Sequence, residues 1–529
     1  MTVAPDTSRA TDGLPIGVER NEPGGARNYR FHILAVTVLL TLPWINPFAP
    51  GPSPAVVPLV FSLLCAAILI GILLCWPGVV TAERLAWTVA SAWLCAGLIS
   101  AVIGLIQYFG FEGSFLPWVN QGRYGEAFAN LRQRNQFASL TNISLSALIW
   151  FGVMFSRRRA LLNRRYSRNY RAFIFLAAAL LACGNAASVS RTGLIQLILL
   201  CALCAIWGQW RQAVVRGILV TAILAYAVSA FMLPRLAEFD LSTHSMFGRL
   251  SAGDSVCSSR LTLWFNVLHL IAMKPWFGWG WGELDYAHYT AAYEWPRFCE
   301  ILDNAHNLPL QLAVEFGLPV ALFVCAGFIL WAVRKKPWLE VNPAKQMAWS
   351  VLAVILLHSM LEYPLWYGPF QMAMILCIAI LLSRARWQSG NGLVRAGCGV
   401  LSASLLVGSI YAIWDYRRIS QIYLAPEARD ARYRTDTLEK ISGSRLFSDQ
   451  VLFARLLLTP LTPSSALWTF ETARALLHFS PEPRVIERLI ESAVMLGRDE
   501  EAGQHILRYR AAFPAEYEVW RGRRPAKPG

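Results

Sequence analysis

The sequence predicts an all-α, polytopic membrane protein with about eleven transmembrane helices, an interfacial helix and a C-terminal soluble helical domain. Of its 529 residues, 55% are hydrophobic and only 15% are charged. The apolar residues gather in stretches close to the roughly 20 residues that a helix needs to cross a bilayer. A soluble globular chain has a smaller share of hydrophobic residues and a larger share of charged ones. The predicted fold class follows from these observations.

The predicted spans follow one another along most of the chain. Residues 1–30 are polar and have no cleavable signal pattern, so we expect a cytoplasmic tail followed by an uncleaved anchor. Seven spans form an N-terminal bundle over 31–234, and four more lie within 308–415. The predicted spans are 31–49, 53–75, 85–107, 136–155, 172–188, 193–209, 215–234, 308–333, 346–361, 367–383 and 396–415.

The net charge of +15 does not indicate nucleic-acid binding, because the basic residues cluster in alternate short loops. The positive-inside rule places the N-terminus and these loops in the cytoplasm. With eleven spans, the loop 235–307 and the segment 416–529 then lie outside. The basic clusters are Arg157–Arg171, Arg211 with Arg216, Arg334–Lys345 and Arg384–Arg395.

The loop 235–307 contains an amphipathic stretch, Arg260–Met273, that is too short to span and is expected to lie in the membrane interface. A turn rich in Gly and Trp follows, Trp276–Glu283. Tryptophan at this density is typical of an interface, and no strand precedes the glycines as a nucleotide-binding loop would require. Cys257 and Cys299 share this loop, where an oxidising compartment would favour a disulfide over two free, buried thiols.

The segment 416–529 shows helical periodicity over 464–478, 484–496 and 500–513, separated by short turns. This pattern predicts a small periplasmic helical domain. Both a helical repeat and a plain helical cap remain open.

The polar stretch Asp303–Asn307 ends at the start of a predicted span and contains His306. A neutral imidazole at a bilayer surface can accept a proton from a hydroxyl, although a satisfied interfacial histidine is the plain alternative. Further polar groups gather at the same outer side. They are Gln133, Asn135, Ser190, Arg191, Arg260, Glu362 and Tyr363.

Two guanidiniums suit phosphate oxygens, so the set fits a lipid-borne sugar diphosphate and an acceptor hydroxyl. Arg191 could instead reach to lipid phosphate, Arg260 could be a surface charge, and Gln133 a hydrogen-bonding loop residue. We expect His358 to form hydrogen bonds inside the bundle and Tyr367 to anchor in the aromatic belt. No cluster has metal-ligand spacing, so we expect metal-independent chemistry with no cofactor.

Asp303–Pro319, Ser190–Gly193 and the Arg260 stretch before a Gly-rich turn resemble the O-antigen ligase/polymerase superfamily. Gln133 with Asn135, and Leu361–Tyr367, are similar to the bacterial protein O-oligosaccharyltransferases of the PglL type. Ala129 and Arg134 depart from that family's usual Gly and Pro. The resemblance implies transfer of a glycan en bloc from undecaprenyl diphosphate to Ser or Thr of pilins and other periplasmic proteins.

The predicted catalytic residues are His306, Arg191 and Arg260. The resemblance implies that the arginines hold the diphosphate, and that Gln133, His306 and Tyr363 are the important polar residues. We expect His306 to orient or deprotonate the acceptor hydroxyl, with Asp303 or Asn307 fixing its tautomer. The predicted substrate-binding residues are Gln133, Asn135, Asp303, Asn307, Glu362 and Tyr363.

The predicted location is the bacterial inner membrane, with the site facing the periplasm and with membrane lipids, but no nucleic acid, as further partners. An O-antigen ligase acting on lipid A-core and a glycan polymerase are alternatives. A transporter of lipid-linked sugars is the alternative that is not an enzyme. It should carry ionisable residues near mid-membrane, whereas these lie at one face.

Overall fold

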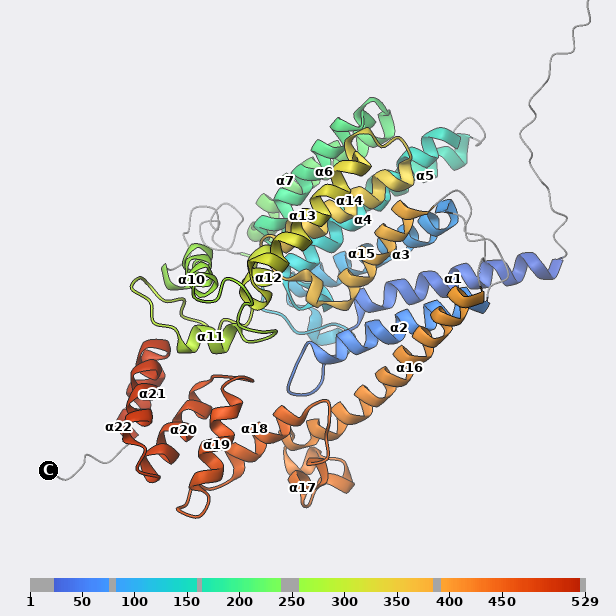
Figure 1. Ribbon diagram of the computed structural model, residues 1–529. Helices are drawn as coiled ribbons and strands as arrows, with labels where there is room; N and C mark the ends of the chain where they lie inside the picture. The colour runs from blue at the N-terminus through green and yellow to red at the C-terminus, as the bar shows by residue number, and fades with distance from the viewer. Residues whose placement is uncertain (1–22, 76–81, 159–163, 239–255, 384–391, 524–529) are drawn as a thin grey trace, which may run out of the picture.

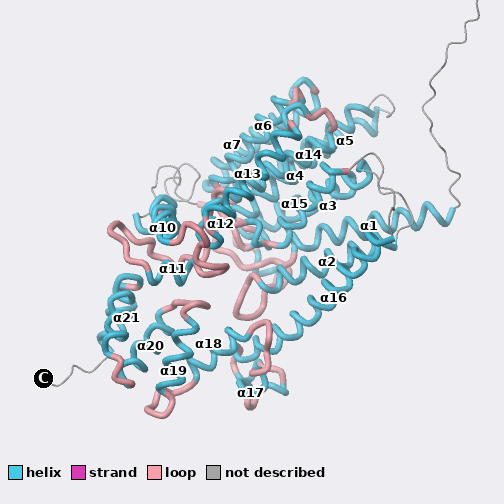
Figure 2. Tube along the Cα trace, viewed as in Figure 1, coloured by secondary structure: helices cyan, strands magenta, loops and turns pink. Residues whose placement is uncertain are grey.

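The computed structural model describes residues 23–75, 82–158, 164–238, 256–383 and 392–523, and its regular elements there are all helices (Figure 1, Figure 2). Parts of two predicted basic loops, 159–163 and 384–391, lie outside the described residues. Helices overlap all eleven predicted spans, and two of them divide the span 308–333. They are α1 (Pro23–Ile45), α2 (Val56–Cys75), α3 (Ala82–Tyr108), α4 (Arg134–Arg158), α5 (Arg164–Ala187), α6 (Arg191–Ile206), α7 (Ala213–Leu236), α12 (Leu308–Phe316) with α13 (Leu318–Lys335), α14 (Pro343–Ser359), α15 (Gly368–Leu382) and α16 (Gly392–Ser420).

The chain is a polytopic membrane protein. Within the described residues, seven helices are long and apolar enough to cross a bilayer, namely α2, α3, α4, α5, α7, α13 and α16. Shorter apolar helices include α6, α15 and the part of α1 from His32 to Ile45. The number of crossings predicted from the sequence, eleven, therefore remains a prediction.

The bundle is organised around α4. In the most apolar 18-residue stretch of this helix, 89% of the residues are buried by the rest of the protein. The helix packs against α3, α5, α6 and α14, and it carries small polar residues at close contacts. The hydroxyl of Ser144, for example, donates to the carbonyl of Trp93 at 2.6 Å. By contrast, α16 packs against α2 at the edge of the bundle and continues into the C-terminal domain (Figure 1).

The prediction of one continuous span over 308–333 is wrong, because the helix breaks at Gly317. This residue has φ +85°, a conformation that glycine adopts without strain. The Gly/Trp turn packs into the break, and the amide of Leu318 donates to the carbonyl of Pro275 at 2.8 Å. The turn therefore packs against the junction between α12 and the long helix α13.

Outside the bundle lie α10 (Arg260–Met273), whose bounds match the predicted amphipathic stretch, and α11 (Leu284–Thr290). Cys257 and Cys299 form a disulfide, with Cα atoms 5.3 Å apart, that closes the loop from which α10 begins.

The C-terminal domain consists of packed helices. The three predicted there appear as α19 (Ala466–Leu476), α20 (Pro483–Met495) and α21 (Asp499–Ala512). The structure adds α17 (Thr437–Ile441), α18 (Ser448–Leu458) and α22 (Pro514–Arg523). Most of these helices share a buried core that includes Phe470, Leu489 and Tyr509, and Tyr289 of α11 packs into the same core.

Candidate active site

Glu362 is the centre of the polar groups predicted from the sequence. It follows the end of α14, and its amide donates to the carbonyl of His358 at 2.8 Å. The side chain is only 7% exposed, yet three groups from distant segments converge on it. Oε2 lies 2.6 Å from Nδ1 of His306, while Oε1 pairs with the guanidinium of Arg260 and accepts from Nδ2 of Asn135 at 3.1 Å.

His306 is held by its own loop in a defined orientation. Its φ of +50° is uncommon for a residue with a side chain, and its amide donates to Oδ1 of Asn304 at 2.9 Å. Its ring and that of Tyr363 form a T-shaped pair, with centroids 5.0 Å apart and planes at 74°. Because Nδ1 faces Glu362, Nε2 points away from that carboxylate.

The expectation that Asp303 or Asn307 fixes the tautomer of His306 is wrong, because Glu362 contacts Nδ1. Asn307 is instead the N-cap of α12, where its side chain accepts from the amide of Leu310 and donates to the carbonyl of Met360. Asp303 is close enough to interact with the charge of His306. Burial raises the pKa of Asp303, and His306 offsets part of that rise.

The electrostatics of the cluster favour an ionised Glu362. Burial alone would raise its pKa, but the hydrogen bond and charge of His306, with Arg260, lower the pKa below its usual value. Burial raises the pKa of Tyr363, and its neighbours Tyr367 and Asp303 add to the rise. Tyr363 therefore remains a neutral phenol near pH 7.

Asn135 connects this cluster to the start of α6. Its Oδ1 accepts from the hydroxyl of Ser190 at 2.6 Å, and Ser190 is the N-cap of α6. Arg191, the next residue, is exposed at the first position of that helix. Gln133 has a local role, because its Oε1 accepts from the amide of Gln136 at 2.7 Å at the start of α4.

The ring of Tyr367, for which we expected a place in the aromatic belt, stacks on Tyr363 with centroids 6.0 Å apart. It therefore lies beside the cluster.

A buried polar network beneath the site was missed from the sequence, except for the prediction that His358 forms hydrogen bonds inside the bundle. Nδ1 of His358 lies 2.9 Å from the hydroxyl of Ser139, which accepts from Gln196 at 2.7 Å. Oε1 of Gln196 in turn accepts from Asn142. The available signal was the repeated spacing of polar residues along α4, Asn135, Ser139 and Asn142, which places them on one helix face.

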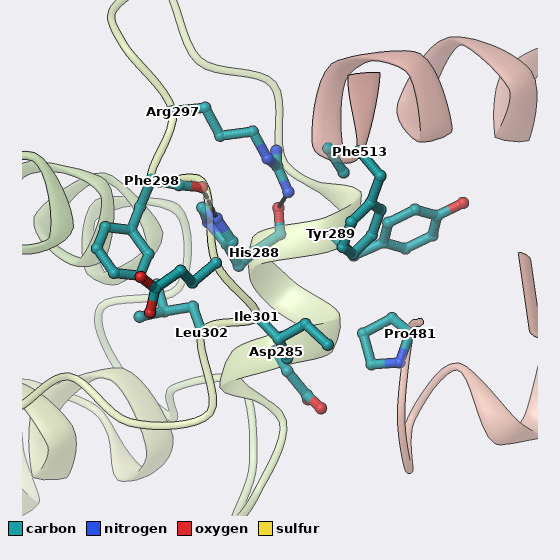
Figure 3. Close-up of a pocket in the computed structure, with 11 residues that line it drawn as sticks. Asp285, His288, Tyr289, Arg297, Phe298, Ile301, Leu302, Pro481 and Phe513 are labelled. Atoms are coloured by element: carbon teal, nitrogen blue, oxygen red, sulfur yellow. Dashed lines mark hydrogen bonds between the residues drawn. The ribbon is translucent and has the colours of Figure 1, made fainter. Parts of the chain in front are cut away.

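A small pocket lies between α11 and the C-terminal domain (Figure 3). Arg297 and His288 brace its wall, since Arg297 donates to the carbonyl of His288 and Nε2 of His288 lies 3.1 Å from the carbonyl of Phe298. Burial raises the pKa of Asp285, which also lines it, to about 7. The pocket's lining residues do not include Glu362, His306, Arg260 or Asn135.

Family models match three parts of the chain. Residues 175–325 match the model for O-antigen ligase, and this stretch of the chain includes Arg191, Arg260 and His306. Residues 127–151 match protein glycosylation ligase, and residues 346–525 match the C-terminal part of a virulence factor membrane-bound polymerase. The segments that contribute to the cluster around Glu362 therefore each fall within a match.

Two curated relatives come from Acinetobacter baylyi. A ComP-specific O-oligosaccharyltransferase is 26% identical over 249 residues, covering 46% of this chain and 42% of the relative. A general O-oligosaccharyltransferase is 25% identical over 351 residues, covering 63% of this chain and 55% of the relative. The matched region thus spans about half the length of these relatives. Parts of the chain are thus similar to the O-antigen ligase family and to protein glycosylation ligase, and O-oligosaccharyltransferases are distant homologues.

Proposed function

We propose that the protein transfers a glycan en bloc from undecaprenyl diphosphate to Ser or Thr hydroxyls of periplasmic or pilin proteins. The observation that carries the proposal is the convergence of His306, Arg260 and Asn135 on Glu362. It combines a proton acceptor, a buried carboxylate and a guanidinium at one point. The names of the relatives in Acinetobacter support a protein acceptor.

His306 would act on the acceptor. Ionised Glu362 accepts a hydrogen bond from the N–H at Nδ1, which keeps the proton there and leaves the lone pair on Nε2, as a carboxylate does for the histidine of a hydrolase triad. The acceptor oxygen attacks the anomeric carbon and its proton passes to Nε2. The bond from that carbon to the diphosphate breaks, and the lipid diphosphate leaves with the bonding electrons.

The arginines would act on the donor. A guanidinium has five N–H donors, so Arg260 can pair with Glu362 and still offer donors to a phosphate. Its side chain is 38% exposed, which leaves it accessible to a ligand. Arg191 would add a second positive charge for the departing diphosphate. Tyr363, Gln133 and Asp303 would line the space for the sugar or the lipid head.

We further infer eleven crossings of the inner membrane, with the N-terminus in the cytoplasm and the site and C-terminal domain in the periplasm. The basic end of α13 supports this orientation, because Arg334–Lys336 would lie inside. The amphipathic α10 would lie in the outer interface. Alkaline-phosphatase fusions should then be active after Ala425 and inactive after Lys336.

Expression in a host without its own glycosylation system, supplied with a known lipid-linked glycan, tests the function. Mass spectrometry should find that glycan on Ser or Thr of periplasmic proteins. The match to O-antigen ligase favours lipid A-core as a second candidate acceptor. Glycan found on lipopolysaccharide alone, with unmodified proteins, would assign the protein to that activity.

A further inference from the structure

Trp281 and Trp366 form a parallel aromatic pair next to the candidate site. Their ring centroids lie 6.1 Å apart and their planes differ by only 4°. Trp281 comes from the Gly/Trp turn, and Trp366 comes from the segment that carries Glu362. Trp366 lies four positions after Glu362 in the sequence, and an extended chain of that length spans at most about 14 Å.

The position of Trp281 is fixed by backbone hydrogen bonds on both sides. Gly280 and Gly282 have φ values of +115° and +75°, which suit glycine. The amide of Gly280 donates to the carbonyl of Glu315 at 3.0 Å, and the amide of Gly282 donates to its Oε1 at 2.9 Å. The indole is therefore presented by a rigid turn.

The same face of α12 also positions His306. Gln311 lies one helical turn before Glu315, and its Oε1 accepts from the amide of Ala305 at 2.6 Å. Ala305 directly precedes His306. One buried helix face thus fixes both the turn that carries Trp281 and the loop that carries His306, while Glu362 connects that loop to the segment of Trp366.

Trp281 is nonetheless 67% exposed. Exposing a large aromatic side chain is unfavourable, so a rigidly held, exposed indole favours a ligand or a lipid neighbour. A sugar ring has one face of C–H groups that suits an aromatic face, while its hydroxyls stay hydrated. The link to His306 and Glu362 favours the sugar over lipid, because a membrane anchor needs no fixed register with a reacting group.

We propose that Trp281 and Trp366 form a saccharide-stacking subsite for the sugar rings of the donor nearest the diphosphate. The assignment rests on the proposed function, since that function supplies the glycan. Trp276, 72% exposed at the start of the same turn, provides a matched control for loss of an exposed indole.

The test uses the full-length protein in lipid nanodiscs with the lipid-linked glycan and an acceptor protein. We expect Trp281→Ala and Trp366→Ala to raise the KM for the donor about tenfold, equivalent to about 1.4 kcal/mol, with kcat changed less than about twofold. Trp281→Phe should retain most of the affinity, and Trp276→Ala should match the wild type. An unchanged KM in Trp281→Ala, or equal effects of Trp276→Ala and Trp281→Ala, would overturn the subsite.

A binding measurement separates the subsite from the proposed function. Saturation-transfer NMR with the glycan freed from its lipid should show binding to the wild type and to Trp276→Ala, and loss of binding in Trp281→Ala. This pattern would support the subsite even if the wild type transferred nothing, which would refute the function alone. Absence of free-glycan binding to the wild type, with an unchanged donor KM in Trp281→Ala, would refute the subsite alone.

Discussion

Nδ1 of His306 lies 2.6 Å from Oε2 of Glu362, and this contact joins two segments that are 56 residues apart in the sequence. The contact orients the imidazole, and the carboxylate that makes it also pairs with Arg260.

Glu362→Gln should lower kcat for glycan transfer by about 10²–10⁴-fold, because a neutral amide stabilises neither the required tautomer nor the imidazolium that forms. Initial rates with purified donor measure the change. Glu112→Gln is the matched control, because Glu112 is half-buried in the short helical segment Glu112–Phe115, away from Glu362 in the sequence. This variant should remain active. A Glu362→Gln protein with normal kcat would remove the carboxylate from the mechanism.

The pH dependence of stability should differ between the wild type and Glu362→Gln. The pKa of Glu362 is lowered in the folded protein, so its interactions stabilise the fold fully above its ordinary pKa of 4.5. That stabilisation is lost as the pH falls through the lower, folded value. The difference in Tm between the two proteins should therefore be constant above about pH 5.5 and shrink on further acidification. A difference that grows toward acid would contradict the lowered pKa.

The two arginines should give different kinetic signatures. Arg191→Ala should mainly raise the KM for the lipid donor, because it removes a phosphate partner. Arg260→Ala should also lower kcat, because it leaves the buried Glu362 without its cation. Lysine should rescue neither fully, since it lacks the planar fork of the guanidinium. Steady-state kinetics of the four variants decide this, and full activity of both lysine variants would exclude a bidentate role.

Loss of the Cys257–Cys299 bond should destabilise the loop that holds Arg260. Closing a loop with a sequence separation of 42 is worth about 4 kcal/mol in the chain-entropy model, less any strain. Cys257→Ser should thus lower the Tm, and the double serine variant should lower it no further. Peptide mapping without reductant that recovers both residues as free thiols would refute the bond.

Hydropathy and charge in the sequence predicted the helices of the bundle and the bounds of α10. Local patterns carry that information, because a buried helix face repeats every three or four residues. The break at Gly317 could not be predicted in this way. It depends on the Gly/Trp turn packing against that point of the chain, a contact between segments about 40 residues apart.

The candidate site was predicted in part. The residue types at the outer helix ends indicated an imidazole, guanidiniums and a carboxylate in one region. The partner of His306 was missed because Glu362 reaches it only after α14 packs against α4. The deeper residues Ser139 and Gln196 were missed because small polar side chains inside a span give little signal until the helices are packed.

The role of His306 is tested most directly by glycan transfer in His306→Gln. Glutamine can form hydrogen bonds but cannot accept the acceptor's proton as imidazole does. We expect this variant to insert in the membrane and bind the lipid donor with wild-type affinity, while glycosylated acceptor falls by at least about 10²-fold by mass spectrometry. Normal glycosylation by His306→Gln would contradict the account and leave electrostatic positioning by the arginines as the better explanation.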